Sequence, residues 1–431
     1  QARNFNKWTS VRPSGGYTNQ VNVLKNWLST RASWIDGQYT AKPRFSVSPG
    51  LVSPGTTVSF SGAGGTVYYT TDGTDPRLPG GAISPSASTN PPINVTTTMV
   101  ITARARSGTG LTSWSGSTQG TFLVGTPASA SNLIITEMMY APAAPSVAEQ
   151  AVSADPSDFE WIELRNVGNE VVQLTDVRFE AGIDFNFTGG NFTTLAPGAR
   201  MLVVRNQTAF EARYGTSLSA SIAGEFGPSR LDNAGERIHL VNALDSTIQD
   251  FTYGDAFPWP GEAGFPGYSL VLIEGADAIP DHGDPVNWRT SGVLGGAPVG
   301  SDQTVLSGDP MADLDGDGVV NIIEHALGTS DADGGEGGSP IEVGVRSFTV
   351  NEMTSDFLVI EFQRGITADD VVVVPEVGSS LDAWEGDQSA VVFVSEVNSN
   401  DGLATITYRS ALPFNPDLNE RLFFRLAVSE R

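Results

Sequence analysis

The sequence predicts a mainly β protein made of several small β-sandwich modules in series, with little helix. At roughly 150 residues per domain, the 431-residue chain is expected to hold about three or four domains. Its 48 glycines and 26 prolines favour turns between short strands over long helices. Hydrophobic residues make up 39% of the chain, which is enough to fill several packed interiors.

The composition also argues against several classes of protein. Lys and Arg number 24 against 49 Asp and Glu, and the net charge of −25 opposes binding to nucleic acid or to anionic membranes. No stretch reaches the ~20 apolar residues of a membrane span, so no membrane insertion is expected. The absence of cysteine excludes disulfides, thiolate zinc sites and cysteine nucleophiles. Because the first residue is Gln1 and not Met, we expect a processed N-terminus or a longer protein with any export signal upstream.

One amphipathic helix is expected near the start, over residues 18–36. The apolar residues that share its face are Val21, Leu24, Trp27, Leu28 and Ile35. This face needs a partner, either an upstream domain or the next module. The strings RNFNKWTS and GGYTNQVNVLKNWLSTRASWID resemble the closing segment of the CotH family of secreted, protein-kinase-like proteins, over residues 1–42. The resemblance carries over no catalytic residue, because that family's nucleotide-binding residues lie upstream of this tail.

Residues 43–125 are expected to form a small β-sandwich. The run from Val67 to Thr71 favours a strand, and Asp72-Gly73 supplies a tight turn after it. The phrases GTVYYTTDGTDP and ITARAR resemble the C-terminal module of chitobiase and β-hexosaminidase-type proteins, which implies an immunoglobulin-like accessory module without catalytic residues. Its aromatic residues suggest sugar binding, but Tyr68 and Tyr69 point to opposite faces, so at most one could stack on a sugar. We favour core or turn roles for these residues.

A larger β domain is predicted after a linker, GTPASASN, at 125–132. In the strand at 159–165, Ile162 and Leu164 face opposite to Glu163 and Arg165. The domain's ordered motifs are IITEMMYAP, EWIELRNVG, TLAPGARMLVV, LDNAGERIHLVN, FTYG and PWPGEAGFPGYSL. Together they resemble the lamin-tail domain, placed at 131–300, which implies an immunoglobulin-like sandwich with an interaction role and no enzymatic site.

Two groups of residues in this domain are candidates for a catalytic site. Glu137 and Glu163 resemble a paired-carboxylate site, but we expect them to hold the sandwich edge by hydrogen bonds to the backbone or to Asn166. The cluster of Asp281, His282 and Asp284 lies among turn residues. The chain contains no HExxH, GxSxG or GxxxxGK[ST] motif, so we expect that it is not an enzyme.

Residues 309–334 contain the motif with the most definite chemistry, a calcium-binding loop followed by a short helix that ends at Gly328. The predicted Ca²⁺ ligands, in loop order, are Asp313, Asp315, Asp317, Val319 through its carbonyl, Asn321 and Glu324. Gly318 makes the sharp turn between them, and the loop resembles the half-hand loops of dockerin-like and thrombospondin-type-3-like repeats. Whether Asp331 and Asp333 add ligands is left open, and His325 is expected at the surface.

After a flexible hinge at 334–340, residues 340–431 are expected to form a final β-sandwich. The whole pattern predicts the non-catalytic C-terminal region of a secreted or cell-surface bacterial protein, acting in adhesion, spacing or protein interaction. The expected partners are other cell-surface or matrix proteins, or else polysaccharide. Two alternatives remain: a carbohydrate-binding accessory region of an extracellular enzyme, and a self-assembling component of a surface filament or lattice.

Overall fold

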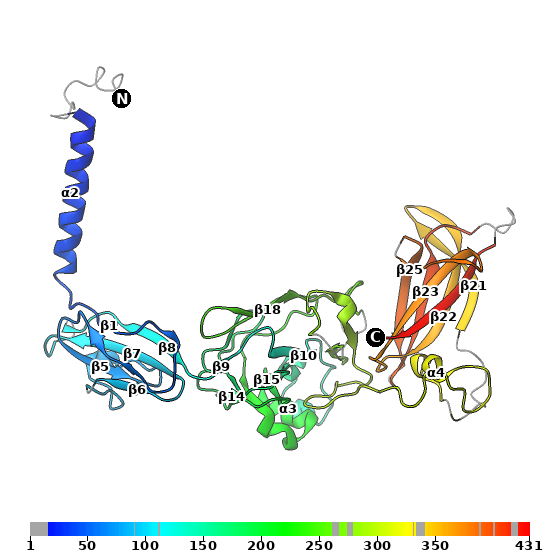
Figure 1. Cartoon of the computed structure of the whole chain (residues 1–431), viewed down its shortest axis with the longest axis horizontal. Helices are drawn as coiled ribbons and strands as arrows, with labels where there is room; N and C mark the ends of the chain where they lie inside the picture. Colours follow the sequence, from blue (N-terminus) through cyan, green and yellow to red (C-terminus); the bar gives the residue numbers. More distant parts are fainter. Residues whose placement is uncertain are drawn as a thin grey trace. The chain divides into compact units, whose positions relative to one another are not determined.

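The protein is mainly β, with several separate sheets and few helices, as the sequence predicts (Figure 1). The chain divides into two compact units, residues 1–125 and 126–431. Among the described residues, no helix has the length and apolar character of a membrane span. The computed structural model describes residues 16–89, 91–110, 113–260, 267–273, 279–330, 332, 341–387, 389–399, 401–414 and 421–431.

The first unit contains the predicted N-terminal helix, α2 (Gly16–Asp36). It starts two residues before the expected boundary and ends at the expected one. None of its residues is buried, and Leu24 and Trp27 are 56% and 60% exposed. The described residues of its own unit therefore do not cover the apolar face, and docking on the next module, one of the two expected partners, is not seen.

The rest of the first unit is a small sandwich, with its core around Val58, Ile101 and Phe122. A four-stranded sheet has the order β2-β8-β7-β5, and the pairs β1-β4 and β3-β6 complete the module. The strands are β1 (Arg44–Phe45), β2 (Gly50–Leu51), β3 (Thr56–Val58), β4 (Phe60–Ser61), β5 (Thr66–Thr70), β6 (Ile93–Val95), β7 (Met99–Arg106) and β8 (Thr118–Leu123). A 3₁₀ turn, η2 (Pro79–Gly81), lies between β5 and β6.

The tyrosines of β5 take the structural roles that we favoured. Tyr69 is buried in the core of the sandwich, next to Phe60. Tyr68 is half-buried against Trp114, with ring centroids 5.4 Å apart. These two side chains therefore do not provide a flat surface on which a sugar ring could stack.

The second unit begins with a larger module, which we call the central sandwich (residues 126–290). Its main sheet has six strands in the order β16-β15-β11-β10-β19-β20, and two three-stranded sheets, β14-β12-β9 and β13-β17-β18, complete the module. The strands are β9 (Thr126–Pro127), β10 (Leu133–Met139), β11 (Trp161–Asn166), β12 (Val172–Gln173), β13 (Arg178–Ala181), β14 (Thr194–Leu195), β15 (Arg200–Val204), β16 (Ile222–Glu225), β17 (Arg237–Val241), β18 (Thr247–Thr252), β19 (Leu270–Leu272) and β20 (Trp288–Thr290).

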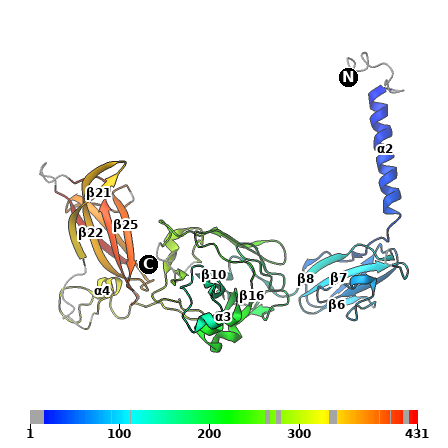
Figure 2. The same cartoon turned by 180° about the vertical axis from the view of Figure 1, so that it is seen from behind.

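Helix α3 (Gln207–Tyr214) makes the main sheet buried on both faces. Asn206 caps its N-terminus, because its Oδ1 accepts a hydrogen bond from the backbone N–H of Ala209 at 3.1 Å. Phe210 of the helix packs on Trp161 and neighbouring side chains of the sheet, and Figure 2 shows α3 beside β16. Glu163, on the face of β11 opposite to Ile162 and Leu164, is fully buried.

The segment predicted as a linker at 125–132 belongs largely to this sandwich. Thr126 and Pro127 form β9, which pairs in parallel with β12. Ala128 is fully buried, and its carbonyl accepts a hydrogen bond from Nδ2 of Asn242 at 2.8 Å. Small residues here serve close packing and not only flexibility.

The C-terminal sandwich (residues 341–431) packs two antiparallel sheets, β21-β22-β26-β25 and β24-β23-β27. Its strands are β21 (Ile341–Val350), β22 (Met353–Gly365), β23 (Val371–Ser380), β24 (Ala383–Glu385), β25 (Val391–Asn398), β26 (Leu403–Ser410) and β27 (Phe423–Glu430). The short helix α4 (Asn321–Leu327) precedes it, and the predicted hinge at 334–340 lies outside the described residues. The remaining 3₁₀ turns are η4 (Glu149–Ala151), η5 (Pro156–Phe159), η6 (Thr216–Ser221) and η8 (Pro285–Asn287).

Replacing Gly328 with alanine should destabilise the C-terminal sandwich. Gly328 ends α4 with a φ of 74°, and an added Cβ would lie 2.2 Å from Cδ2 of Leu403. We expect the free energy of unfolding to fall by about 2 kcal/mol, from the left-handed backbone and the crowding together. Chemical denaturation should measure it, with Gly344→Ala on β21 as the control, because nothing lies within 4 Å of a Cβ there. Equal stability of the two variants would contradict this account of the helix end.

Candidate functional site

The acidic loop before α4 folds on itself through its own backbone. Asp313 accepts hydrogen bonds from the backbone N–H groups of Gly316 and Gly318, at 2.8 and 3.1 Å. Asp317 accepts one from the N–H of Val319 at 2.8 Å. Both glycines have positive φ, 78° and 96°, which a residue with a Cβ adopts only with strain. These local bonds fix the turn that the sequence predicts.

Three of the predicted calcium ligands come together in this loop. One carboxylate oxygen each from Asp313, Asp315 and Asp317 lies within 4.8 Å of the others. Oδ2 of Asp315 is shielded from solvent and accepts no hydrogen bond from the described residues. Like charges at such a distance repel each other by about 1 kcal/mol per pair even in water, and a hard dication with oxygen ligands removes that repulsion. The carboxylates therefore fit a Ca²⁺ ion.

The other predicted ligands lie close by in sequence but outside this group of carboxylates. Asn321 begins α4, and its Nδ2 donates to the carbonyls of Ser307 and Asp309 at 2.8 and 3.2 Å. Glu324 is 3% exposed on the same helix and is not part of the group. Val319 follows the last aspartate of the group. Asp331 and Asp333, left open by the sequence, lie outside the described residues.

Helix α4 attaches the loop to the C-terminal sandwich. Ile322 and Ala326 pack with Ala368 and Val371, and Leu327 joins the sandwich core. His325 is not the surface residue that we expected, because its side chain is 13% exposed and its Nε2 lies 2.7 Å from Oδ1 of Asp370. The helix presents this residue to the loop between β22 and β23. Any change in the acidic loop can therefore reach the sandwich through α4.

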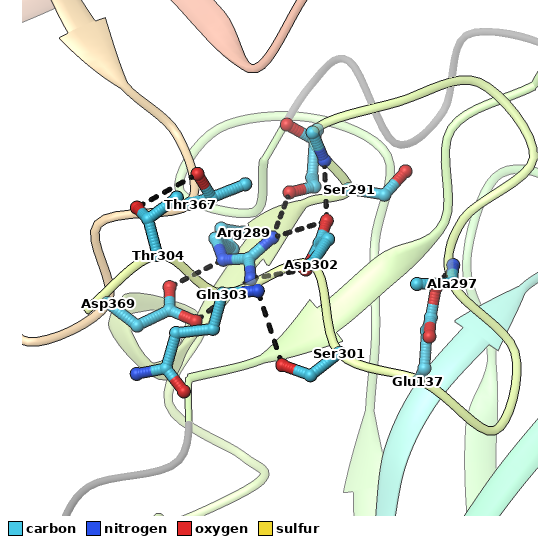
Figure 3. Close-up of polar contacts among 12 residues, drawn as sticks. Glu137, Arg289, Ser291, Ala297, Ser301, Asp302, Gln303, Thr304, Thr367 and Asp369 are labelled. Atoms are coloured by element: carbon cyan, nitrogen blue, oxygen red, sulfur yellow. Dashed lines mark hydrogen bonds and ion pairs between the residues drawn. The ribbon is translucent and has the colours of Figure 1, made fainter. Parts of the chain in front are cut away.

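A buried arginine joins the central sandwich to the C-terminal sandwich (Figure 3). Arg289 on β20 is 8% exposed; its Nη2 lies 2.7 Å from Oδ1 of Asp302, and its Nε lies 2.5 Å from Oδ1 of Asp369. Burial acts to lower the pKa of Arg289, but the hydrogen bonds to both aspartates outweigh it and raise that pKa above its ordinary value. No local sequence pattern indicates this site, because Arg289 and Asp369 are 80 positions apart.

Glu137 and Glu163 face each other on β10 and β11, and both are buried. Glu137 accepts hydrogen bonds from the backbone N–H of Ala297 at 3.0 Å and from Ser269 Oγ at 2.5 Å. Glu163 accepts from the N–H of Val299 at 2.6 Å and pairs with Arg200. The two carboxylates thus clamp the segment 295–300, which leads toward the acidic loop.

This arrangement confirms the expected bonds to backbone and corrects the expected partner Asn166. Nδ2 of Asn166 donates instead to the carbonyls of Glu170 and Leu195, both at 2.8 Å. A cavity of only about 20 Å³ adjoins Glu137, enough for a water molecule but not for a sugar ring. The pair therefore lacks the cleft that a glycosidase needs.

The residues of the cluster around His282 also make structural hydrogen bonds. Nε2 of His282 lies 2.9 Å from the carbonyl of Ile135, and Nδ1 lies 3.2 Å from that of Pro280. Burial lowers the pKa of His282, which favours the neutral ring, and a neutral ring donates a hydrogen bond to only one of these two carbonyls. Asp281 accepts from the N–H of Gly283, and Asp284 caps η8. The histidine thus pins a loop to β10, and neither aspartate is seen hydrogen-bonded to it, as a catalytic relay would require.

Glu137 should make the stability of the protein fall with rising pH. Burial, and then the charge of Glu163, raise the pKa of Glu137 from 4.5 to about 8. Between these values the folded chain keeps a proton on Glu137 that the unfolded chain releases, so the free energy of unfolding decreases by up to about 1.4 kcal/mol per pH unit. Burial also raises the pKa of Glu160, to about 7, which adds a decline in the same direction.

Between about pH 5 and pH 8, the free energy of unfolding obtained from denaturation curves should therefore depend less steeply on pH for Glu137→Gln than for the unmodified chain. Glu149→Gln serves as the control. Hydrogen bonds from Arg213 lower the pKa of Glu149 to about 2, so its contribution changes only at acidic pH. An unchanged pH dependence in Glu137→Gln would show that Glu137 is ionised in the folded protein.

Comparison with known proteins identifies one part of the chain. Residues 126–255 match the family model of the Lamin Tail Domain, an immunoglobulin-like fold that is not enzymatic. The match covers β9 to β18, and β19 and β20 complete the main sheet beyond it. No curated protein matches the chain. The central sandwich thus contains a lamin tail domain, and the other predicted resemblances remain predictions.

Proposed function

We propose that this chain is a non-catalytic, protein-binding part of a secreted or cell-surface bacterial protein, in which its modules serve adhesion or spacing. The lamin tail domain at 126–255 carries the proposal, because this fold acts as an interaction module and not as an enzyme. The structural bonds of Glu137, Glu163 and His282 support it, since the best candidates for catalysis among the described residues are engaged elsewhere. The partners proposed are other surface or matrix proteins.

Calcium is proposed as the ion that fixes the acidic loop and, through α4, strengthens the C-terminal sandwich. The convergence of Asp313, Asp315 and Asp317 supports this role, as does the packing of Ile322 and Ala326 on the sandwich. Ion binding would add its binding free energy to the stability of this region. An excess of calcium about a hundredfold above the Kd stabilises the bound state by about 2.7 kcal/mol. Such an ion suits the calcium-rich surroundings of an exported protein.

Asp315→Asn should weaken calcium binding at least about tenfold, because a charged ligand becomes a neutral one. Titration calorimetry with Ca²⁺ and melting curves with and without chelator measure the effect. Asp387→Asn is the matched control, since Asp387 likewise accepts a backbone bond two residues on, at 2.8 Å from the N of Ser389. No heat with the unmodified chain, together with a melting temperature that ignores chelator, would refute the calcium site.

Self-association is a second candidate function, favoured by strand β21. This ten-residue strand is an edge of its sheet, and most of its residues are exposed, including Val343 at 50% and Val345 at 47%. An uncovered edge with apolar side chains can pair with a strand of a second copy.

If the chain self-associates through β21, Val345→Lys should shift it to the monomer, because an edge lysine opposes strand pairing. Light scattering over a range of concentrations, with and without Ca²⁺, measures the mass. Leu412→Lys, which changes a residue that is 75% exposed outside the strand, is the control and should behave as the unmodified chain. A monomeric unmodified chain under all these conditions would dismiss this second function.

A further inference from the structure

A cleft of about 460 Å³ lies between the central sandwich and the C-terminal sandwich of the second unit. Its volume falls within the range of small-molecule sites. Arg289 lies in its lining, so the ion pairs to Asp302 and Asp369 hold the two walls in place. The described residues of its lining include none of the acidic loop and neither Glu137 nor Glu163.

Aromatic rings come into the cleft from both walls. Phe257 of the central sandwich stacks on Phe393 of the C-terminal sandwich, with ring centroids 4.9 Å apart and planes 10° apart. Trp259 is half-buried in the lining, and its ring lies 6.2 Å from that of the buried Trp288. Tyr408 adds a ring on the opposite wall. Flat rings at a cleft surface suit ligands that have an apolar face.

Apart from Arg289, which is paired with Asp302 and Asp369, the charged groups in the same lining balance each other. Arg364 and Arg431 supply hydrogen-bond donors, and Asp284 and Glu396 supply acceptors. Nε of Arg431 also donates to the carbonyl of Asp369 at 2.9 Å, which places this side chain beside the ion pairs of Arg289. The paired signs give little net attraction for an ion of either charge. They suit a neutral ligand that both donates and accepts hydrogen bonds.

We propose that this cleft binds a neutral saccharide of one or two rings. The C–H face of a sugar ring packs on an aromatic ring, while its hydroxyl groups donate to carboxylates and accept from guanidinium groups. The net charge of −25 opposes an acidic saccharide, because the whole chain repels it. This proposal does not depend on the calcium loop or on protein partners.

Titration of the full chain with neutral disaccharides tests the proposal. The probes are cellobiose, maltose, lactose and diacetylchitobiose, with a uronic-acid disaccharide and an aromatic tripeptide for comparison. Calorimetry and tryptophan fluorescence should give a Kd of about 1 mM or tighter for at least one neutral probe. If no neutral probe binds at about 10 mM, or if only the acidic probe or the peptide binds, the proposal is overturned.

Variants locate the site and separate it from general effects on folding. Trp259→Ala should weaken the binding of the best neutral probe at least about tenfold, because it removes a stacking face. Arg364→Gln should also weaken it, and it leaves the aromatic residues in place. Trp384→Ala changes a tryptophan of the same C-terminal sandwich outside the cleft lining and should bind as the unmodified chain. Unchanged binding in both Trp259→Ala and Arg364→Gln would place the saccharide elsewhere and refute the proposal.

Discussion

The buried ion pairs of Arg289 are the constraint on which the second unit depends. A guanidinium group out of water is costly unless its partners are in place, and here one partner comes from the linking segment and the other from the C-terminal sandwich. The aspartates must therefore return to the same positions whenever the chain folds. The position of the two walls of the aromatic cleft follows from this junction, because Arg289 lies in the cleft lining.

The acidic loop could be predicted from the sequence because its information is local. Asp313, Asp315 and Asp317 alternate within five residues, and Gly316 and Gly318 permit the backbone that turns them toward each other. The junction at Arg289 could not be predicted in this way. Its partner Asp369 lies 80 residues away, and nothing in the alternation of β20 distinguishes this arginine from a solvated one.

The strands were predictable to a useful degree, but what covers them was not. Alternation in β11 separates Glu163 from Ile162 and Leu164, but it does not reveal that α3 and the carboxyl clamp bury the face of Glu163. Small residues at 125–132 indicated a linker, whereas Ala128 fills the core. In both cases the missing information is tertiary, since a helix or a sheet from elsewhere in the chain decides which face meets solvent. His325 on α4 is a further example, because it was expected at the surface but contacts Asp370 instead.

The clamp formed by Glu137 and Glu163 has a consequence for how the chain can diverge. Within the segment 295–300, both carboxylates accept hydrogen bonds from main-chain N–H groups, those of Ala297 and Val299. Almost any amino acid supplies that group, so these two bonds do not require particular side chains, whereas the packing of Val299 on the core and its φ of 64° do restrict that position. Proline is the exception, because it has no N–H to offer. Proline at either position would therefore remove one of the two bonds by which the carboxylates hold the segment 295–300.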